Sequence, residues 1–260
     1  MDTNTFALLV KKELVDNRKP LMLGLTGIWA TYILLGAFLG YVKSMVPVEL
    51  FLFFFFGGMI LTIGASLAFN NMKSKEGRIN TIILPATVSQ KFIVRWLAMV
   101  PLLMIVVLIG VLLGDWARII VYKIMIRMGD YTPAYDSAYV DTTALAFISS
   151  NYRHEPEGIG IMITCGVWGA LCSQAIYFLG AVVWPKLSFI KTWAATQVLG
   201  VILSLFCVPF LMNLKLDFAF DLSYAGVVWI INILGLAFCV VLYWLAYERF
   251  KRSEVIYKLF

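Results

Sequence analysis

The chain has 260 residues, of which 62% are hydrophobic and 14% are charged, and its formal net charge is +6. A soluble globular domain of this composition would have too few polar side chains to cover its surface, so that class of protein is excluded. Six uncharged runs reach or approach the roughly 20 apolar residues that a helix needs to cross a membrane. Backbone polar groups must pair within each segment in lipid, and no run alternates as a barrel strand does. The sequence therefore predicts a single all-α membrane domain over residues 1–260, with spans at about 20–42, 50–70, 92–114, 159–184, 192–213 and 222–247.

Residues 2–19 have the periodicity of an amphipathic helix. Its apolar and basic side chains include Phe6, Val10, Leu14, Lys11 and Lys12. Such a helix can lie in the headgroup layer, with membrane lipid as its partner. We expect Pro20 to break it where the first span begins. The alternative is an ordinary basic lead-in that only sets the topology.

The segment 70–91, between the second and third spans, is more structured than a simple connection needs to be. Before Pro85, a short helix is predicted. One of its sides carries Ile79, Ile82 and Ile83, and the other carries Lys75, Arg78 and Thr81. Pro85 should end this helix, because the residue before a proline avoids the α conformation. Thr87 and Gln90 have the spacing of a capping box, which predicts that a second helix starts there and enters the third span.

The third uncharged run ends at Gly114, and residues 115–157 follow before the fourth span. The first part, 115–128, is helix-prone but charged, so we expect a separate interfacial helix on the outer side, with Trp116 and Tyr122 in the headgroup zone. The rest is interpreted as a cap on the outer ends of the spans. A surface that contacts a substrate or a partner is the alternative.

Small residues recur at four-residue spacing within the spans, which allows helix backbones to approach closely. The pattern occurs at Gly36/Gly40, Gly110/Gly114, Gly166/Ala170 and Gly169/Ser173. We interpret all of these as helix-packing positions.

The spans carry few polar groups, and no ionisable residue lies centrally in any predicted span. This disfavours a proton-coupled antiporter, because such proteins use intramembrane ionisable groups. Gln174, Gln197 and Asn232 are candidates for lining a transport pathway. The alternative for each is a hydrogen bond between helices.

The distribution of basic residues predicts the orientation of the chain. With the N-terminus in the cytoplasm, fifteen of the 21 Lys and Arg residues fall on the inner side. Both termini are therefore expected in the cytoplasm, and the net positive charge is a topology signal that does not call for nucleic acid.

The sequence contains no recognisable catalytic or metal-binding constellation. His154 is the single histidine, no glycine is followed by lysine as a phosphate-binding P-loop requires, and the four cysteines form no C-x-x-C pair. We therefore predict no catalytic residue, no metal site and no cofactor in this chain, and interpret the cysteines as small buried apolar residues.

Taken together, these elements resemble the membrane subunits of ABC type 2 exporters. The resemblance covers the N-terminal helix, the six spans and the first cytoplasmic loop, and its most specific part is the passage Ile82–Phe92, with Leu84-Pro85-Ala86 followed by a polar residue and a long helix. It implies a permease of the plasma membrane, the inner membrane in bacteria. The permease would pair with a second copy or a paralogue and with a separate ATPase subunit that holds ATP and Mg. It implies an elbow helix at Phe6, Val10, Lys11, Lys12 and Leu14. The implied coupling helix is formed by Lys73, Lys75, Glu76, Arg78, Ile79, Ile82, Ile83, Leu84 and Pro85.

The chain departs from the resemblance in one respect, and two other functions compete with it. Exporter subunits of this size often place their main outer elaboration between the fifth and sixth spans, whereas here 115–157 is long and 213–221 is short. The chief alternative function is an ATP-independent membrane scaffold or assembly factor that binds another cytoplasmic partner. A membrane enzyme ranks third, because catalytic groups are missing.

Overall fold

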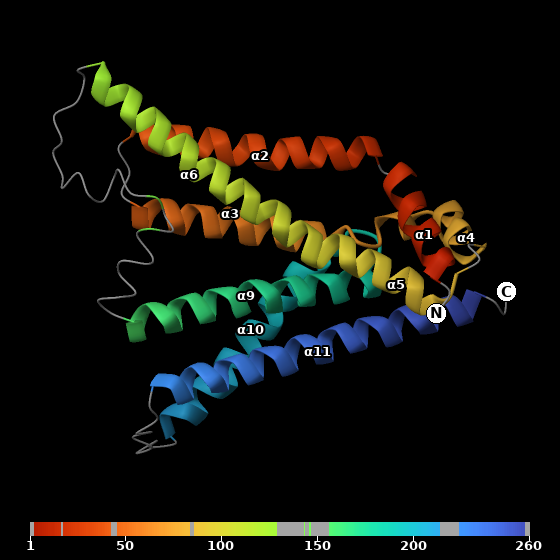
Figure 1. Cartoon of the computed structure of the whole chain (residues 1–260). Helices are drawn as coiled ribbons and strands as arrows, with labels where there is room; N and C mark the ends of the chain where they lie inside the picture. Colours follow the sequence, from red (N-terminus) through yellow and green to blue (C-terminus); the bar gives the residue numbers. More distant parts are fainter. Residues whose placement is uncertain are drawn as a thin grey trace. The chain divides into compact units, whose positions relative to one another are not determined.

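The computed structural model describes residues 3–16, 18–42, 46–83, 86–128, 143, 146, 156–213 and 224–257, and every regular element among them is helical (Figure 1). The elements are α1 (Thr3–Asp16), α2 (Arg18–Tyr41), α3 (Val46–Ser66), the 3₁₀ turn η1 (Asn70–Lys73), α4 (Lys75–Ile83), α5 (Val88–Leu97), the π-helical turn η2 (Ala98–Leu102), α6 (Leu103–Arg127), α9 (Pro156–Val183), α10 (Ser188–Asn213) and α11 (Tyr224–Tyr257).

Five helical segments among the described residues are long and apolar enough to cross a membrane. They are Leu21–Tyr41, Val48–Ser66, Val88–Arg127, Ile163–Val183 and Val228–Ser253. These segments define a multi-pass helical membrane protein, as the composition predicts. The predicted span at 192–213 lies in α10, where the apolar helix among the described residues, Ser188–Leu203, is shorter. Six spans therefore stay a prediction.

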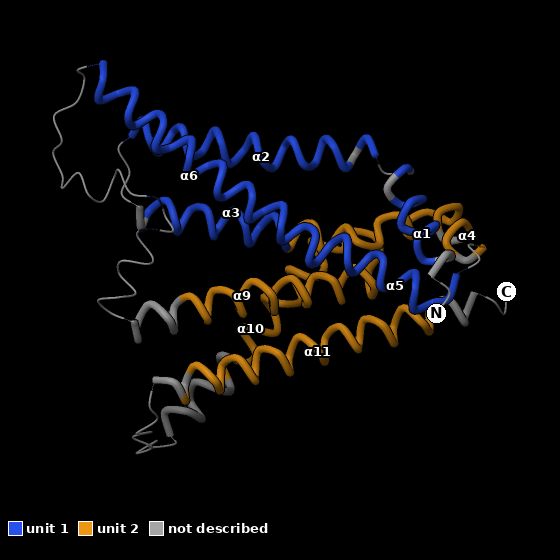
Figure 2. The backbone as a smooth tube through the Cα atoms, in the orientation of Figure 1, with its two compact units in different colours: residues 1–61, 85–160 blue, residues 62–84, 161–260 orange. Residues whose placement is uncertain are grey.

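The helices form two compact units (Figure 2). The first comprises residues 1–61 and 85–160, which include α1, α2, most of α3, α5 and α6. The second comprises residues 62–84 and 161–260, which include the end of α3, η1, α4 and α9 to α11. The predicted single domain stays a prediction.

In the first unit, α2 packs on α6 through glycines, as the four-residue spacing predicts. A Cβ atom added to Gly36 would collide with the backbone of Gly114, and one added to Gly40 would lie 2.5 Å from the carbonyl oxygen of Arg118. A Cβ on Gly110 would lie 2.6 Å from the ring of Tyr32. The contacts advance along both helices in the same direction, so α2 and α6 run parallel, as first and third spans of alternating topology must.

Proline positions explain where these helices start and bend. α2 already begins at Arg18, so the expected break at Pro20 is wrong: the proline lies in the first turn, where its missing N–H needs no partner. Pro101 lies within the π-helical turn η2, which joins α5 to α6. A π-helical turn is wider than an α-helical one and accommodates a proline, which lacks the N–H of a regular backbone hydrogen bond.

The predicted separate interfacial helix at 115–128 is wrong, because α6 continues without a break from Leu103 to Arg127. Two of the charges that argued for a separate element, Asp115 and Arg118, are buried, so they do not force the helix to end at Gly114. The remainder of 129–157 lies outside the described residues except for Thr143, Ala146 and the first residues of α9.

In the second unit, an aromatic cluster joins the end of α3 to α9 and α11. The ring of Phe69 contacts the rings of Phe178 and Phe250 at centroid distances of 5.4 and 5.2 Å, and Phe178 also contacts Tyr243 at 5.8 Å. The three phenylalanines are buried. η1 and α4 follow this cluster directly in the chain. The contacts of Phe69 therefore hold the residue at which the predicted coupling segment begins.

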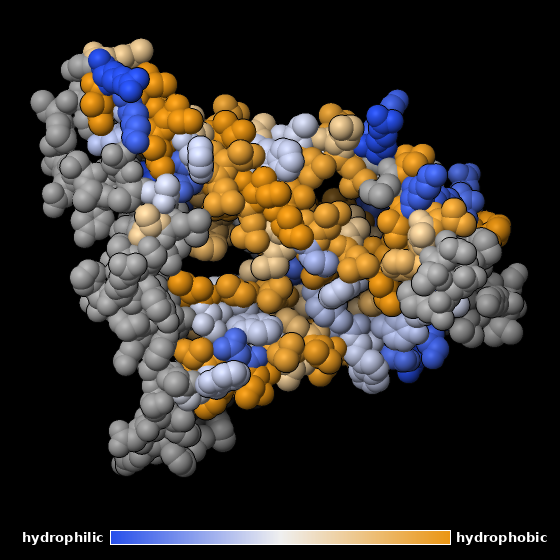
Figure 3. Space-filling view, viewed as in Figure 1, coloured by the Kyte–Doolittle hydropathy of each residue, from blue (hydrophilic) through white to orange (hydrophobic). Residues whose placement is uncertain are grey.

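Many of the largest apolar side chains point outward, as expected of helices that face lipid. Leu23 and Leu34 on α2 are exposed, as are Phe51 and Phe54 on α3 and Trp229 on α11. Along α2 and α6, Figure 3 shows mainly hydrophobic surface, with hydrophilic surface at the start of α2 and at the C-terminal end of α6.

Candidate functional site

The α4 surface, which we define as Lys73, Lys75, Glu76, Ile79 and Ile83, is the leading candidate site. Its helix is held in place by local contacts. The backbone N–H of Gly77 donates to the Ser74 hydroxyl at 3.1 Å, and a Cβ atom on Gly77 would collide with the carbonyl oxygen of Asn71. Only glycine fits this close approach of α4 to η1.

Among the α4 side chains that the structure describes, a threonine is buried and two isoleucines are exposed. Thr81 is buried, and its hydroxyl donates to the carbonyl oxygen of Gly77 at 2.8 Å. Ile79 and Ile83, one helical turn apart, are 44% and 72% exposed. In an amphipathic helix packed on a core, isoleucines would normally be the buried side chains.

The charged residues of the α4 surface precede this isoleucine pair in the sequence. Lys73, Lys75 and Glu76 are all exposed, with two positive charges and one negative. The side chains of Arg78 and Ile82, together with Leu84 and Pro85, lie outside the described residues. The α4 surface therefore combines two exposed isoleucines with two exposed lysines and one exposed glutamate.

The predicted capping box at the start of α5 is confirmed. The backbone N–H of Gln90 donates to the Thr87 hydroxyl at 3.3 Å, and the backbone N–H of Thr87 donates to the Gln90 side-chain oxygen at 3.1 Å. Two N–H groups of the first turn are thus satisfied reciprocally, which fixes the point where α5 begins.

The N-terminal helix α1 has the expected division into two faces. Leu9 is buried, Phe6 and Val10 are half-buried, and α1 contacts α5 within the first unit. Lys11 and Lys12 are exposed, and the side chain of Leu14 lies outside the described residues. Its location at the membrane surface stays a prediction.

The three candidate pathway residues lie in three different environments. Gln174 is buried on α9, whereas Gln197 is exposed on α10. Asn232 on α11 accepts a hydrogen bond from the Trp168 indole N–H at 2.8 Å and donates to the carbonyl oxygen of Val228. For Asn232, the alternative of a hydrogen bond between helices is therefore the observed one.

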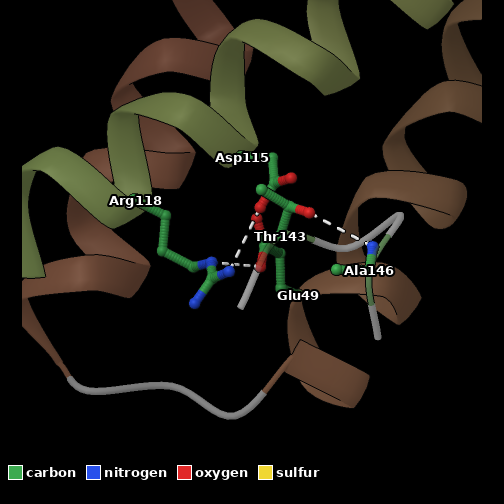
Figure 4. Close-up of polar contacts among 5 residues, drawn as sticks. All are labelled: Glu49, Asp115, Arg118, Thr143 and Ala146. Atoms are coloured by element: carbon green, nitrogen blue, oxygen red, sulfur yellow. Dashed lines mark hydrogen bonds and ion pairs between the residues drawn. The ribbon is translucent and has the colours of Figure 1, made fainter. Parts of the chain in front are cut away.

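The first unit contains a buried cluster of charged side chains that the sequence analysis did not predict (Figure 4). Arg118 on α6 forms an ion pair with Glu49, in the first turn of α3, and its Nη2 donates to Asp115 Oδ1 at 3.1 Å. The three side chains are 0–3% exposed. Figure 4 also draws Thr143, whose hydroxyl accepts from the backbone N–H of Ala146 at 3.1 Å.

Glu49 and Asp115 lie just beyond the predicted spans at 50–70 and 92–114, and both fall within helical segments that are long and apolar enough to cross a membrane. One guanidinium contacts two carboxyl side chains, Glu49 from α3 and Asp115 from its own helix. Removing one partner of a buried ion pair typically costs about 3–5 kcal/mol, because the other charge stays buried and uncompensated. The cluster therefore links α3 to α6, and we call Glu49, Asp115 and Arg118 the clamp. The i, i+3 spacing of Asp115 and Arg118, beside an otherwise apolar run, was the available sequence signal.

No group of three or more His, Cys, Asp or Glu side chains able to hold a metal ion occurs in the described part of the chain.

Comparisons with protein-family models, with curated proteins and with solved structures found no match for this chain.

Proposed function

We propose that the chain is the membrane-spanning permease subunit of an ATP-driven ABC type 2 exporter. In this proposal a separate ATPase subunit docks on the cytoplasmic segment 70–91, with α4 as the coupling helix, and a second copy or a paralogue completes the permease. The exposed isoleucine pair of α4 is the observation that carries the proposal.

The exposure of Ile79 and Ile83 supports a protein partner for α4. A nine-residue helix is marginal in water on its own, and here its own fold leaves the apolar pair uncovered. Fully burying an isoleucine contributes about 1.5–3 kcal/mol. Since Ile83 is 72% exposed, its burial in a groove would contribute about 1–2 kcal/mol to docking.

The position of α4 in the chain supports a mechanical role. α4 follows the Phe69 cluster, which packs the end of α3 on α9 and α11. Packed side chains transmit displacement because protein interiors have low compressibility. A partner that moved α4 would thus displace the cytoplasmic ends of helices that cross the membrane. In the proposal, ATP and Mg in the partner supply the energy and α4 receives the motion.

The test is copurification with an ATP-binding-cassette subunit encoded beside this chain, using two matched variants. Ile79→Glu places a charge in the proposed docking surface. Ile126→Glu makes the same change near the C-terminal end of α6, at a side chain of nearly equal exposure, 45% against 44% for Ile79. We expect Ile79→Glu to lose the ATPase subunit and Ile126→Glu to retain it.

Two outcomes would contradict the proposal. One is retention of a functional ATPase subunit by Ile79→Glu. The other is a partner that depends on Ile79 and neither binds nor hydrolyses ATP, which would favour the scaffold function.

A further inference from the structure

The α9–α11 seam, which we define by Trp168, Cys172 and Phe178 on α9 and by Asn232, Cys239 and Tyr243 on α11, contains a pair of thiols. Cys172 Sγ and Cys239 Sγ are 3.6 Å apart, although 67 positions separate them in the sequence. The Trp168–Asn232 hydrogen bond lies on one side of the pair, and the Phe178–Tyr243 ring contact lies on the other. The thiols are therefore held at a defined position along two packed helices.

The seam is tight next to the thiol pair. A Cβ atom on Gly235 would lie 2.5 Å from the indole of Trp168, so a larger residue there would push the helices apart. The contacts advance in the same direction along α9 and α11, and the helices therefore run parallel. Both cysteines lie well inside the segments that can cross a membrane, Ile163–Val183 and Val228–Ser253.

We propose that Cys172 and Cys239 form an oxidation site, in which small uncharged two-electron oxidants that enter the membrane convert the two thiols into a disulfide joining α9 to α11. The sulfur atoms must approach from 3.6 Å to a bond of about 2.05 Å, a shortening of about 1.5 Å. This role differs from the expected one of inert apolar residues. It does not depend on the proposed transport function.

The order of the steps follows from exposure. Cys172 is half-buried and Cys239 is buried, so the oxidant reaches the Cys172 sulfur first. With molecular iodine as the oxidant, the Cys172 thiol forms a sulfur–iodine bond, and its proton leaves with one iodide. The Cys239 sulfur then attacks this sulfur, the sulfur–sulfur bond forms, the second iodide leaves, and the Cys239 proton is released. Two thiols are oxidised and one iodine molecule is reduced.

The test uses the full-length chain in membrane vesicles, treated with iodine, quenched, denatured and alkylated. Proteolysis and mass spectrometry then measure the peptide that contains both Cys172 and Cys239 and is lighter by two hydrogen atoms. We expect most of the wild-type protein to carry this linkage and to lose alkylation at both positions. A variant with Cys165→Ala and Cys207→Ala should behave in the same way, because it retains the pair.

Cys165 is the matched comparison, because it lies on the same helix as Cys172 and is exposed. Cys172→Ala and Cys239→Ala should each abolish the linked peptide and leave the remaining thiol of the pair open to alkylation. The proposal is overturned if both cysteines of the wild-type protein are still alkylated after oxidation. It is equally overturned if the linked peptide joins Cys165 to Cys239. Both results are read in the wild-type protein and need no variant to fold.

Discussion

Replacing Gly36 with alanine should separate α2 from α6, because no space exists for one additional methyl group. The added Cβ would lie 2.7 and 2.9 Å from the carbonyl carbon and the Cα of Gly114 and would collide with its carbonyl oxygen. These are backbone atoms and cannot rotate away. Overpacking of this kind typically costs about 1–3 kcal/mol. The higher helix propensity of alanine offsets at most about 1 kcal/mol of that loss.

Gly27→Ala is the matched control on the same helix, because nothing lies within 4 Å of a Cβ at that position. It should be neutral or should stabilise the protein by up to about 1 kcal/mol. Gly110→Ala should fall between the two, since the added atom meets the Tyr32 side chain and not backbone. The measurement is reversible unfolding of the purified protein in mixed detergent micelles with increasing sodium dodecyl sulfate. A Gly36→Ala protein as stable as Gly27→Ala would refute the packing of α2 on α6.

Two further substitutions test local features in the same unfolding assay. Arg118→Gln should lower the free energy of unfolding by about 3–5 kcal/mol, because Glu49 and Asp115 stay buried and lose the guanidinium that contacts both. Exposed Arg127→Gln should stay within about 0.5 kcal/mol of wild type, and equal losses would contradict the clamp. Leu187, between α9 and α10, has a left-handed backbone at φ 56°, so Leu187→Gly should raise stability by about 1 kcal/mol, whereas a loss would argue against that conformation.

Features encoded by neighbouring residues could be predicted from the sequence. The capping box needs only Thr87 and Gln90, three positions apart, and the structure has both of its hydrogen bonds. The short helix before Pro85 and the five helices long and apolar enough to cross a membrane likewise follow from local composition and periodicity.

Features that depend on a distant partner could not be predicted in the same way. Asp115 and Arg118 can stay inside a continuous helix because Glu49, from another helix, completes their pairing. The glycine patterns likewise do not show from the sequence alone which of them form close helix contacts. Gly36 and Gly114 are in close contact, whereas a Cβ on Gly166 or Gly169 would meet nothing within 4 Å, because spacing alone does not specify which helix lies opposite.

The sequence predicted the helix within the candidate site, but it did not predict which of the helix's side chains are exposed. The segment 70–91 contains the expected helix, but burial of Thr81 turns Ile79 and Ile83 outward. A helix of this length has too few periodic positions for the sequence to decide which side packs on its neighbour. The outward isoleucine pair strengthens the reason to look for a partner.

The central claim is that an ATPase subunit covers α4, and photo-crosslinking tests it most directly. A photoreactive phenylalanine analogue is placed at Ile83 and, as the control, at Ile126, which is exposed on α6. The membranes are irradiated and the crosslinked peptides are identified. We expect position 83 to crosslink to the ATP-binding-cassette subunit and position 126 not to do so. Crosslinks from position 83 to lipid alone, or to a protein that does not bind ATP, would contradict the account.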